Sequence, residues 1–391
     1  MSEHVFIAAA ARTPIGSFQG VLAKRTAPEL GAHAIRAVLG TSDPARAIDE
    51  VIFGNVISAG LKQAPARQAS RLAGLPDACG ATTVNKVCGS GMKAAMLAFD
   101  LIRAGSAQAV VCGGMESMSN APYLLTRLQS GLRMGHGESS GVAPVRDAMF
   151  LDGLEDAETG GSMGSFAQAT ADERQISREA MDAYALESVL RARRAIEQRR
   201  LAAEISPIQI DGNVISDDEQ PRRAKPEKIP ALKPAFKNDG TITAANSSSI
   251  SDGAAALLIS AESALADRTP LARIVGHATH SQHPATFTNA PVGAMRRLAA
   301  RIGWRLDEVD LFEINEAFAM VTMIAMQELN LPHAKVNIYG GACAQGHPIG
   351  STGARLLVTL AHALQNTGGR RGIASLCIGG GEATAVALER V

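Results

Sequence analysis

The sequence is poor in aromatic residues: Phe, Tyr and Trp make up only 4% of its 391 positions. A core with so few rings must be filled by Ala, Val, Leu, Ile and Met, and a hydrophobic share of 46% supplies them. Glycine is abundant instead, at 38 residues, which indicates many tight turns and close backbone contacts. The chain is longer than one hydrophobic core usually holds, so we expect two or three domains.

Net charge is also missing, because 38 basic residues balance 38 acidic ones. No overall positive field exists to attract nucleic acid or an anionic membrane. No stretch approaches the roughly 18 consecutive apolar residues of a membrane helix. The first residues lack the positive charge with which a signal peptide begins. We therefore expect a cytoplasmic protein with no nucleic-acid or membrane partner.

Cysteine pairs with metal-binding spacing are absent as well. The chain has five cysteines, an odd number, and no two of them form a CxxC pair. A disulfide framework and a zinc site are therefore not expected. No P-loop motif occurs. Residues 89–94, GSGMKA, loosely match a dinucleotide loop, but the later residues 109–111 are apolar where a ribose-binding acid is required. We expect neither a metal nor a permanently bound cofactor.

Two regions of the chain repeat one order of features: an acidic start, a buried strand, an Asn, a Gly-rich turn, an apolar helix, a strand and a Gly cluster. The strands with their Asn are IDEVIFGNV at 48–56 and LDEVDLFEINE at 306–316. The turns are VNKVCGSG at 84–91 and GGACAQGHPIGSTG at 340–353, and the helices cover 92–103 and 354–364. The closing strands with their glycines are AVVCGG at 109–114 and ASLCIGGG at 374–381.

This repetition predicts two similar α/β halves, although two βαβ units can also look alike by chance. Each helix is apolar nearly all round, and such a helix is buried on every face. We expect the two helices to pack together between two sheets, with other helices on the outer faces. The predicted division is residues 1–118 plus 249–270 for the first half, 119–248 for an inserted loop domain, and 271–391 for the second half.

The inserted segment has a different character, with polar loops, a helix at 177–200 and a Pro-broken basic stretch at 220–234. Ser177 is the expected N-cap of that helix, and Glu179 adds a favourable charge in its first turn. The helix carries five arginines that we interpret as a solvated face; they are Arg191, Arg193, Arg194, Arg199 and Arg200. The basic stretch is either a phosphate-binding element or a solvated loop.

Four residues are candidates for chemistry. Cys88 precedes a helix, where free N–H groups and the helix dipole favour a thiolate and lower its pKa; the alternative is a buried core cysteine. His347 occupies the equivalent turn of the second half, as a general base or as a structural histidine. Cys377, at a strand end, could shuttle a proton, and Asn315 could hold a water or donate to an oxyanion. The other thiols, Cys79, Cys112 and Cys343, are expected in the core.

Several motifs extend these patterns along nearly the whole chain. They are RTPIGSFQG (12–20), NVISAG (55–60), PARQAS (65–70), VNKVCGSGMKA (84–94), GGMESMSNAPY (113–123), KPAFKNDGTITAANSS (233–248), NEAFA (315–319), GGACAQGHPIGSTGAR (340–355) and CIGGG (377–381). In this order and spacing they resemble the thiolase family. The resemblance implies an α/β fold of five layers, αβαβα, built from two similar halves with an inserted loop domain that binds CoA.

The resemblance also implies an activity, that of an acetyl-CoA C-acetyltransferase or 3-ketoacyl-CoA thiolase of fatty-acid metabolism. Such an enzyme joins two acyl-CoAs, or cleaves 3-ketoacyl-CoA with CoA, in ping-pong steps. Cys88 would carry the acyl group, His347 would deprotonate it, and Cys377 would act as acid and base. Asn315 would hold a water that, with His347, stabilises the enolate. The N–H groups of Cys88 and Gly379 would form an oxyanion hole.

Positions that match the family's CoA contacts follow from the same resemblance. They are Leu154, Met163, Arg222, Phe236, Ala244, Ser248, Ile250, Ala317 and Phe318. Arg223 is a rival to Arg222 for the nucleotide end of CoA, because the loop is one residue shorter than in relatives. A homodimer, or a homotetramer joined through residues 119–140, is implied as well.

The chain departs from acetyl-specific relatives near the predicted pocket. Ser162 stands where His is common, Phe287 where Met is common, and Glu382 follows the last glycine where an apolar residue or Gln is common. Phe287 would shape the acyl pocket, so a broad or longer-chain thiolase is the alternative. Two further alternatives are another condensing enzyme of the same superfold, and a non-catalytic relative that binds lipid or acts as a scaffold.

Overall fold

The computed structural model describes residues 4–40, 48–125, 145–265 and 268–391. Within these described residues, the first half contains six strands and three helices. Its strands are β1 (Val5–Arg12), β2 (Gly16–Ser17), β3 (Glu50–Gly54), β4 (Gly80–Val84), β5 (Ala109–Ser117) and β10 (Ser251–Ala261). Its helices are α1 (Ala27–Leu39), α2 (Pro65–Leu72) and α3 (Ser90–Arg103).

The second half follows the same plan. Its strands are β11 (Ala272–Ser281), β12 (Leu311–Ile314), β13 (Arg371–Ile378) and β14 (Glu382–Arg390). Its helices are α8 (Ala290–Ile302), α9 (Ala319–Leu329), α10 (Ala342–Gln345) and α11 (Ile349–Thr367). Short 3-10 helices, η4 (Glu262–Ala264), η5 (Pro284–Asn289), η6 (Leu306–Glu308) and η7 (His333–Lys335), complete the connections from β10 onward.

One sheet runs through both halves in the order β12-β13-β14-β11-β1-β10-β5-β3-β4. A short antiparallel pairing of β1 with β11 joins the two arms. Outward from that junction the arms correspond strand by strand, β1-β10-β5-β3 on one side and β11-β14-β13-β12 on the other. Even β4 has a counterpart, because Val336 bridges to Phe312 of β12 in parallel. The predicted duplication is confirmed.

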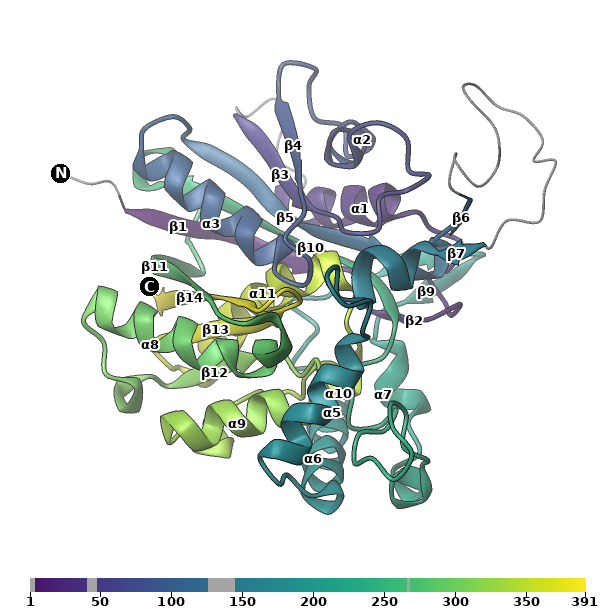
Figure 1. The fold of residues 1–391 in the computed structure, drawn as a ribbon. Helices are drawn as coiled ribbons and strands as arrows, with labels where there is room; N and C mark the ends of the chain where they lie inside the picture. The colour runs from purple at the N-terminus through teal and green to yellow at the C-terminus, as the bar shows by residue number, and fades with distance from the viewer. Residues whose placement is uncertain (1–3, 41–47, 126–144, 266–267) are drawn as a thin grey trace.

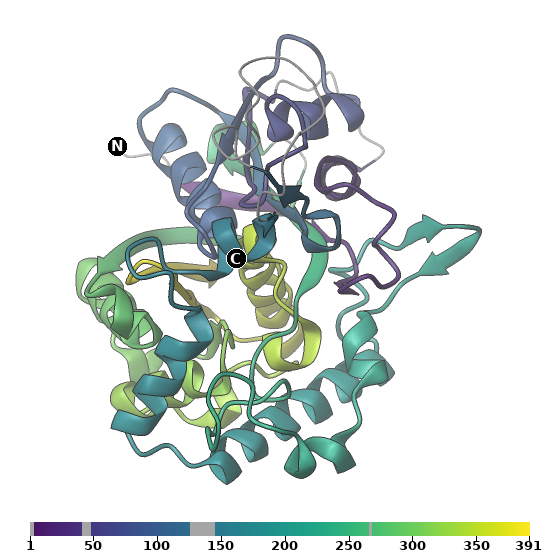
Figure 2. The same ribbon diagram turned by 45° about the vertical axis from the view of Figure 1, so that its right-hand side comes forward.

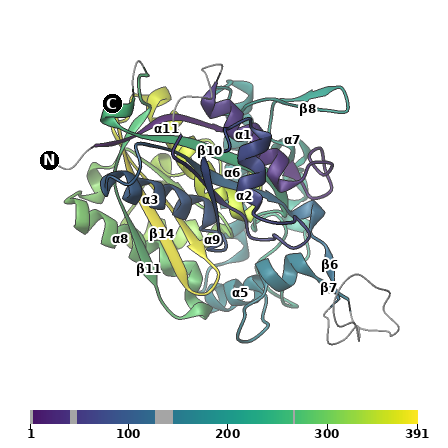
Figure 3. The same ribbon diagram turned by 90° about the horizontal axis from the view of Figure 1, so that it is seen from above.

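The layers are as predicted, except that the two expected sheets are the arms of one continuous sheet. Helices α3 and α11 contact each other and lie between the two arms of the sheet, while α1 and α2 cover one outer face (Figures 1 and 3). Helix α8 covers the other outer face and contacts β11, β13 and β14. Every residue of α11 from Ile349 to Leu364 is buried. This burial on all sides confirms the expectation drawn from its apolar character.

Helix α3 departs from the same expectation. Leu97, Phe99 and Leu101 remain partly exposed, although Met92 and Met96 are fully buried. The buried side packs against α11 and the sheet. Phe99 meets the ring of His277 of β11 edge to face at 5.3 Å, and it still stays only half-buried. The apolar sequence of α3 therefore predicted more burial than the structure shows.

The inserted lobe replaces a hairpin turn. In the second half, Gly379 to Gly381 join β13 directly to β14, whereas in the first half the corresponding strands β5 and β10 are connected through the lobe. Figure 1 shows most of the lobe beside the second half, and Figure 2 shows its β-hairpin extending away from the sheets. Its elements are η1 (Met118–Asn120), β6 (Tyr123–Leu124), β7 (Arg146–Asp147), η2 (Phe150–Leu154), α5 (Met163–Glu173), α6 (Arg178–Glu197), β8 (Ile208–Ile210), β9 (Asn213–Ile215), α7 (Glu219–Arg223) and η3 (Pro226–Ala231). The predicted domain boundaries stay a proposal.

Helix α6 begins as predicted, with the Ser177 side chain accepting a hydrogen bond from the N–H of Ala180. The arginine face is only partly solvated, however. Arg191 donates to the carbonyls of His333 and Val336, and Arg193 donates to those of Pro221 and Ala224. These two arginines tie α6 to its neighbours, because the ends of nearby short helices leave carbonyls that need donors.

Other expectations concern the cysteines and membrane segments. Cys79, Cys112 and Cys343 are buried, which confirms them as core residues. No helix among the described residues combines the length and the apolar character needed to cross a membrane. The loop expected to mediate tetramer formation, residues 119–140, lies outside the described residues from position 126 onward.

Candidate active site

The start of α3 and the start of α11 meet at the centre of the molecule, and glycine makes this approach possible. A Cβ on Gly91 would lie 2.8 Å from the backbone nitrogen of Ala354. A Cβ on Gly54 would lie 2.7 Å from the carbonyl oxygen of Gly350. Real Cβ contacts are longer than this, so the two halves could not touch here with larger residues. The Gly-rich turns of both halves therefore converge on one place.

Cys88 lies in the turn before α3, against the hairpin that follows β13. The backbone N–H groups of Gly379 and of Cys88 itself lie near the Cys88 sulfur, where they act to lower the pKa of its thiol. Val87, directly before it, adopts φ 47°, a left-handed conformation that is costly for a β-branched residue. The turn thus holds the thiol under two N–H donors supplied by the two halves of the chain.

The thiol of Cys88 is not activated by its position alone. Its pKa is raised to about 11, mainly by burial and to a smaller extent by the charge of Glu116, while the two N–H groups act in the opposite direction. The expectation that a helix start would lower this pKa is therefore wrong: desolvation of the thiolate outweighs the N–H donors. At neutral pH the group is a protonated thiol, so a nucleophilic Cys88 requires a base.

His347 provides an unprotonated imidazole. Its Nδ1 lies 2.7 Å from Oγ1 of Thr352, and that hydroxyl donates to the carbonyl of Pro348 at 3.0 Å. Because the Thr352 proton is used there, we assign the His347 proton to Nδ1, which leaves Nε2 as an acceptor. Burial, and then the positive charge of Arg355, lower the His347 pKa to about 3. The ring is neutral and can accept a proton through Nε2.

Asn315 follows β12 and faces the same imidazole. Its Nδ2 lies 3.5 Å from Nε2 of His347, and its side chain is almost fully buried. Its Oδ1 finds no hydrogen-bond partner among the described residues. A buried amide oxygen without a partner is costly, and a water molecule is the usual remedy. The geometry therefore fits the expectation that Asn315 holds a water next to His347.

Cys377 is the second-to-last residue of β13 and is completely buried. Burial raises its pKa well above the ordinary value, and the neighbouring Cys88 raises it further. Such an electrostatic effect requires the two sulfurs to be close. The structure thus brings together Cys88, Cys377 and Gly379, and it places Asn315 beside His347 next to the start of α11.

Most of the predicted CoA contacts gather on one side of this centre. The loop at 246–248 is joined to Phe318 and its neighbours, with Ser248 Oγ donating to the Ala317 carbonyl at 3.1 Å. The ring of Phe318 meets those of Phe236 and Phe287 edge to face. Met163 reaches the hairpin, its sulfur 3.2 Å from where a Cβ of Gly379 would be. Leu154 and Ile250 share an apolar cluster with Cys88, and Ala244 is exposed.

The two adjacent arginines of α7 point to different surroundings. Arg223 lines a cavity together with Phe18, Ser249 and Ile250. Arg222 faces another cavity, beside Arg199 and its ion-pair partner Asp217. The stretch at 220–234 is not irregular, since it forms α7 and η3. Beside Ile250, one of the predicted CoA positions, the structure places Arg223 and not Arg222.

Sequence reasoning missed three residues that organise the site. Glu116 accepts hydrogen bonds from the N–H groups of Val56, Ile57 and Gly350 and from the Asn55 amide. Burial raises its pKa to about 7, against the opposing effect of these backbone donors. Glu316 accepts from Tyr184, Ser188, Asn337 and the Cys343 N–H. Thr352 sets the His347 tautomer. An acid at the end of an apolar strand, as in GGMES and EINE, was the available signal.

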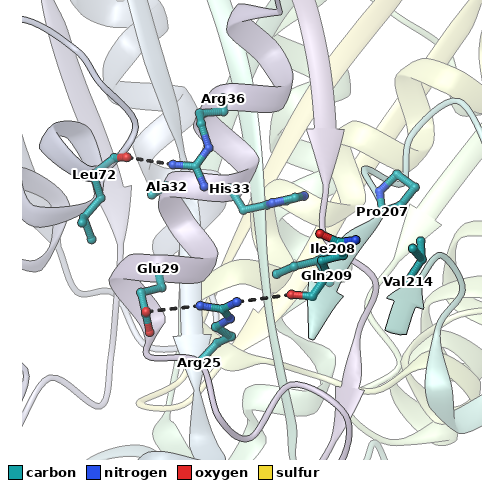
Figure 4. Close-up of a pocket in the computed structure, with 10 residues that line it drawn as sticks. All are labelled: Arg25, Glu29, Ala32, His33, Arg36, Leu72, Pro207, Ile208, Gln209 and Val214. Atoms are coloured by element: carbon teal, nitrogen blue, oxygen red, sulfur yellow. Dashed lines mark hydrogen bonds and ion pairs between the residues drawn. The ribbon is translucent and has the colours of Figure 1, made fainter. Parts of the chain in front are cut away.

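A separate cavity of about 550 Å³ lies between α1 and the β8–β9 hairpin (Figure 4). Its cationic groups already have protein partners. Arg25 meets Glu29 and the Gln209 carbonyl, Arg36 donates to the Leu72 carbonyl, and His33 meets Ser206. None of the candidate catalytic residues lines this cavity. It therefore forms no part of the candidate active site.

Comparison with known proteins covers the whole chain. Residues 5–263 match the model of the thiolase N-terminal domain, and residues 268–390 match that of the thiolase C-terminal domain. The chain is 47% identical to an acetyl-CoA acetyltransferase of Pseudomonas aeruginosa, over 99% of this chain and 100% of that one. It is 46% identical to an acetyl-CoA acetyltransferase of Escherichia coli, over the full length of both.

Solved structures give the same result. The chain is similar to the Acat5 thiolase of Ascaris suum in complex with coenzyme A, with a TM-score of 0.92, 39% identity and full coverage of both chains. It is also similar to human mitochondrial 3-ketoacyl-CoA thiolase in complex with CoA, with a TM-score of 0.93 and 36% identity over 100% of this chain and 98% of that one.

Proposed function

Because this chain belongs to the thiolase family and is an acyltransferase, we propose that it makes and breaks the carbon–carbon bond of 3-ketoacyl-CoA through a thioester on Cys88. The observation that supports this most is the convergence of two N–H donors on the Cys88 sulfur with a second thiol beside it. Acyl transfer needs a nucleophile, donors for the oxyanion and an acid–base group, and all three meet here.

In the cleavage direction, His347 Nε2 takes the proton of Cys88, and the thiolate attacks the 3-keto carbon. The N–H groups of Cys88 and Gly379 receive the oxyanion. The bond between C2 and C3 then breaks and leaves an acetyl-CoA enolate. Protonated His347, with a water on Asn315, stabilises the enolate oxygen, and Cys377 gives its proton to C2.

The second half-reaction releases the acyl group. The Cys377 thiolate takes the proton of an incoming CoA thiol, and the CoA sulfur attacks the acyl thioester on Cys88. The tetrahedral intermediate collapses to acyl-CoA, and His347 returns its proton to the Cys88 sulfur. Both cysteines end as thiols, as they began, and condensation is the same sequence in reverse. The high pKa of Cys377 suits a group that must hold a proton until the enolate forms.

For CoA we propose contacts from Leu154, Met163, Phe236, Ser248, Ile250, Ala317 and Phe318, with Ala244 at the exposed edge. Arg223 is proposed for the nucleotide end in preference to Arg222, because only Arg223 shares a cavity with Ile250. The relatives solved with CoA support CoA as the shared substrate, and they hold it as a ligand.

For the acyl chain we propose a preference for acetyl transfer, with Phe287 closing the pocket. Phe287 is buried and its ring lies edge to face against that of Phe318, so we propose that the two rings limit the space for a longer acyl chain. The alternative, a broad 3-ketoacyl-CoA thiolase of fatty-acid degradation, rests on the departures at Ser162 and Phe287. A Phe287→Leu variant is expected to raise the ratio of long-chain to acetoacetyl-CoA activity.

The decisive experiment is CoA-dependent thiolysis of acetoacetyl-CoA and of longer 3-ketoacyl-CoAs, with Cys88→Ala as the control. Turnover that disappears in Cys88→Ala supports the proposal, and the preferred substrate length decides between its two forms. Full activity in Cys88→Ala, or no turnover with any substrate, would contradict it. Thiolysis also excludes another type of condensing enzyme or a non-catalytic binding protein, because neither would cleave 3-ketoacyl-CoA with CoA.

We also propose a role in fatty-acid metabolism, a cytoplasmic location, and assembly into a homodimer or homotetramer. Light scattering tests the last of these. A monomer in solution at micromolar concentration would refute it.

A further inference from the structure

We propose that the ion pair between Lys86 and Glu382 positions the two loops that carry the Cys88 and Gly379 N–H donors. Lys86 precedes Cys88 by two positions, and Glu382 follows Gly379 by three. Lys86 Nζ lies 2.5 Å from Glu382 Oε2, although the two residues are 296 positions apart. This inference rests on the proposed function, because it assigns positioning residues to the same oxyanion hole.

Both partners of the pair are held in place by their own surroundings. Glu382 begins β14 and accepts a hydrogen bond from Ser281 Oγ of β11 through its second oxygen, at 3.1 Å. The backbone N–H of Lys86 donates to Ser90 Oγ, at the first residue of α3, at 2.8 Å. The pair therefore connects the base of the β13–β14 hairpin to the start of α3.

Three contacts join the loop at residues 86–89 to the hairpin at residues 378–382. At one end, Lys86 meets Glu382. In the middle, the Gly379 N–H meets the Cys88 sulfur. At the other end, Gly89 lies against Ile378, so closely that a Cβ on Gly89 would overlap the Ile378 side chain. The oxyanion donors are thus flanked by an apolar contact on one side and by the ion pair on the other.

Backbone contacts hold the far end of the hairpin turn, where the Gly381 carbonyl accepts a hydrogen bond from the Gln282 N–H at 2.8 Å. The turn consists of Gly379, Gly380 and Gly381, and the last two adopt φ 88° and 84°. A Cβ on Gly380 would meet no atom within 4 Å. Glycine turns gain no side-chain packing and are conformationally permissive. Glu382, the residue that follows the turn, supplies the side-chain contact with the Cys88 loop that the glycines cannot make.

The pair is also better placed than an ordinary surface ion pair. The side chains of Lys86 and Glu382 are only 20% and 30% exposed, and partial burial reduces screening by solvent and salt. Oxyanion donors act only when they are aimed at the developing charge, and small displacements are costly. Loss of the pair should therefore lower the rate of acyl transfer more than it weakens CoA binding.

The test uses Glu382→Gln, Lys86→Met and the exchanged pair Lys86→Glu with Glu382→Lys. Glu389→Gln is the matched control, because Glu389 lies on the same strand and forms a partly buried ion pair with Arg273. Exchange of labelled CoA into acetyl-CoA measures the rate of acyl transfer. Labelling by iodoacetamide measures the reactivity of the Cys88 thiol in a reaction that forms no oxyanion.

We expect kcat for exchange to fall roughly tenfold in each single variant, at unchanged KM, because a displaced donor retains part of the effect of a complete one. The iodoacetamide rate should fall less than kcat does, because alkylation creates no oxyanion and loses only the smaller effect of the Gly379 N–H on the Cys88 pKa. The exchanged pair should recover most of the lost kcat, and Glu389→Gln should keep the wild-type value. A change that merely loosened the fold would alter kcat and the alkylation rate alike, or would persist in the exchanged pair.

Wild-type kcat in both single variants would overturn the proposal and leave the proposed function intact. An exchanged pair as slow as the single variants would overturn it as well, because charge complementarity would then not matter. No exchange by the wild-type protein would contradict the proposed function itself, and this inference would fail with it.

Discussion

Asn315 and His347 stand 32 positions apart in the chain, yet the amide nitrogen of Asn315 faces Nε2 of the imidazole at 3.5 Å. The opposite ring nitrogen is held by Thr352 at 2.7 Å. The imidazole is thus fixed from both sides, with its free lone pair toward Asn315. The contact with Thr352 therefore sets the tautomer of His347, although no chemical role was predicted for Thr352.

Thr352→Val is expected to lower kcat by about two- to tenfold, because a neutral hydrogen bond contributes about 0.5–1.5 kcal/mol. Without the hydroxyl, Nδ1 loses its acceptor and the proton can move to Nε2, where it blocks the base. Thr352→Ser keeps the hydroxyl and should keep the wild-type kcat. Steady-state thiolysis measures both variants. Equal rates in Val and Ser variants would show that the tautomer does not depend on this contact.

The lowered pKa of His347 predicts how stability changes with pH. In the unfolded chain His has a pKa of about 6.5, whereas in the folded protein it is about 3. Below pH 6.5 the unfolded state therefore binds a proton that the native state does not bind, and stability falls as the pH drops. Lowering the pH from 6.5 to 5 should lower the free energy of unfolding by about 2 kcal/mol through this site.

Urea unfolding of the wild-type protein and of His347→Gln at both pH values measures this effect. The variant lacks the titrating group, so its free energy of unfolding should decrease less than that of the wild-type protein. Parallel decreases would mean that His347 titrates normally in the folded protein.

Arg223→Ala is expected to raise the KM for CoA by about two- to fivefold, the effect of losing one exposed charge contact. Arg222→Ala is the matched control, since both side chains are 63% exposed and each forms one ion pair. Only Arg223 lies on the Ile250 side, so Arg222→Ala should leave KM unchanged. The effect should shrink at high salt. A larger increase in the Arg222 variant would reverse the assignment.

Glu116→Gln is expected to lower the free energy of unfolding by about 1–3 kcal/mol, the cost of leaving buried polar groups without partners. Each carboxylate oxygen of Glu116 accepts two hydrogen bonds, all from N–H donors. An amide would turn an NH₂ group toward two of these donors. Thermal or urea unfolding measures the loss. A variant as stable as the wild-type protein would show that Glu116 is protonated there and makes fewer of these bonds.

The repeated order of strands, glycines and helices was enough to predict the architecture. Periodicity and turn chemistry are local properties, so the strands around 48–56 and 109–114 and the N-cap at Ser177 could be read from the residues themselves. The correspondence of β1-β10-β5-β3 with β11-β14-β13-β12 could not, because the order of strands in a sheet depends on contacts between distant segments. The partial exposure of α3 likewise depends on what surrounds it.

The candidate site divides in the same way. Motifs identified Cys88, His347, Cys377 and Asn315, because reactive side chains next to glycine turns are visible in a linear sequence. The state of those groups was not visible. A helix start favoured a thiolate at Cys88, whereas burial in the folded chain raises its pKa to about 11. Desolvation depends on every atom packed around the sulfur, and no motif records that.

By itself, the sequence determined the two-fold repetition, the glycine turns and the chemical groups placed in them. Tertiary structure alone decided which of these groups meet. It turned Arg223, not Arg222, toward Ile250, and it joined Lys86 to Glu382 across the two halves. The physical reason is that hydrophobic burial brings the halves together without regard to direction, while hydrogen bonds and charges then select which side chains face each other.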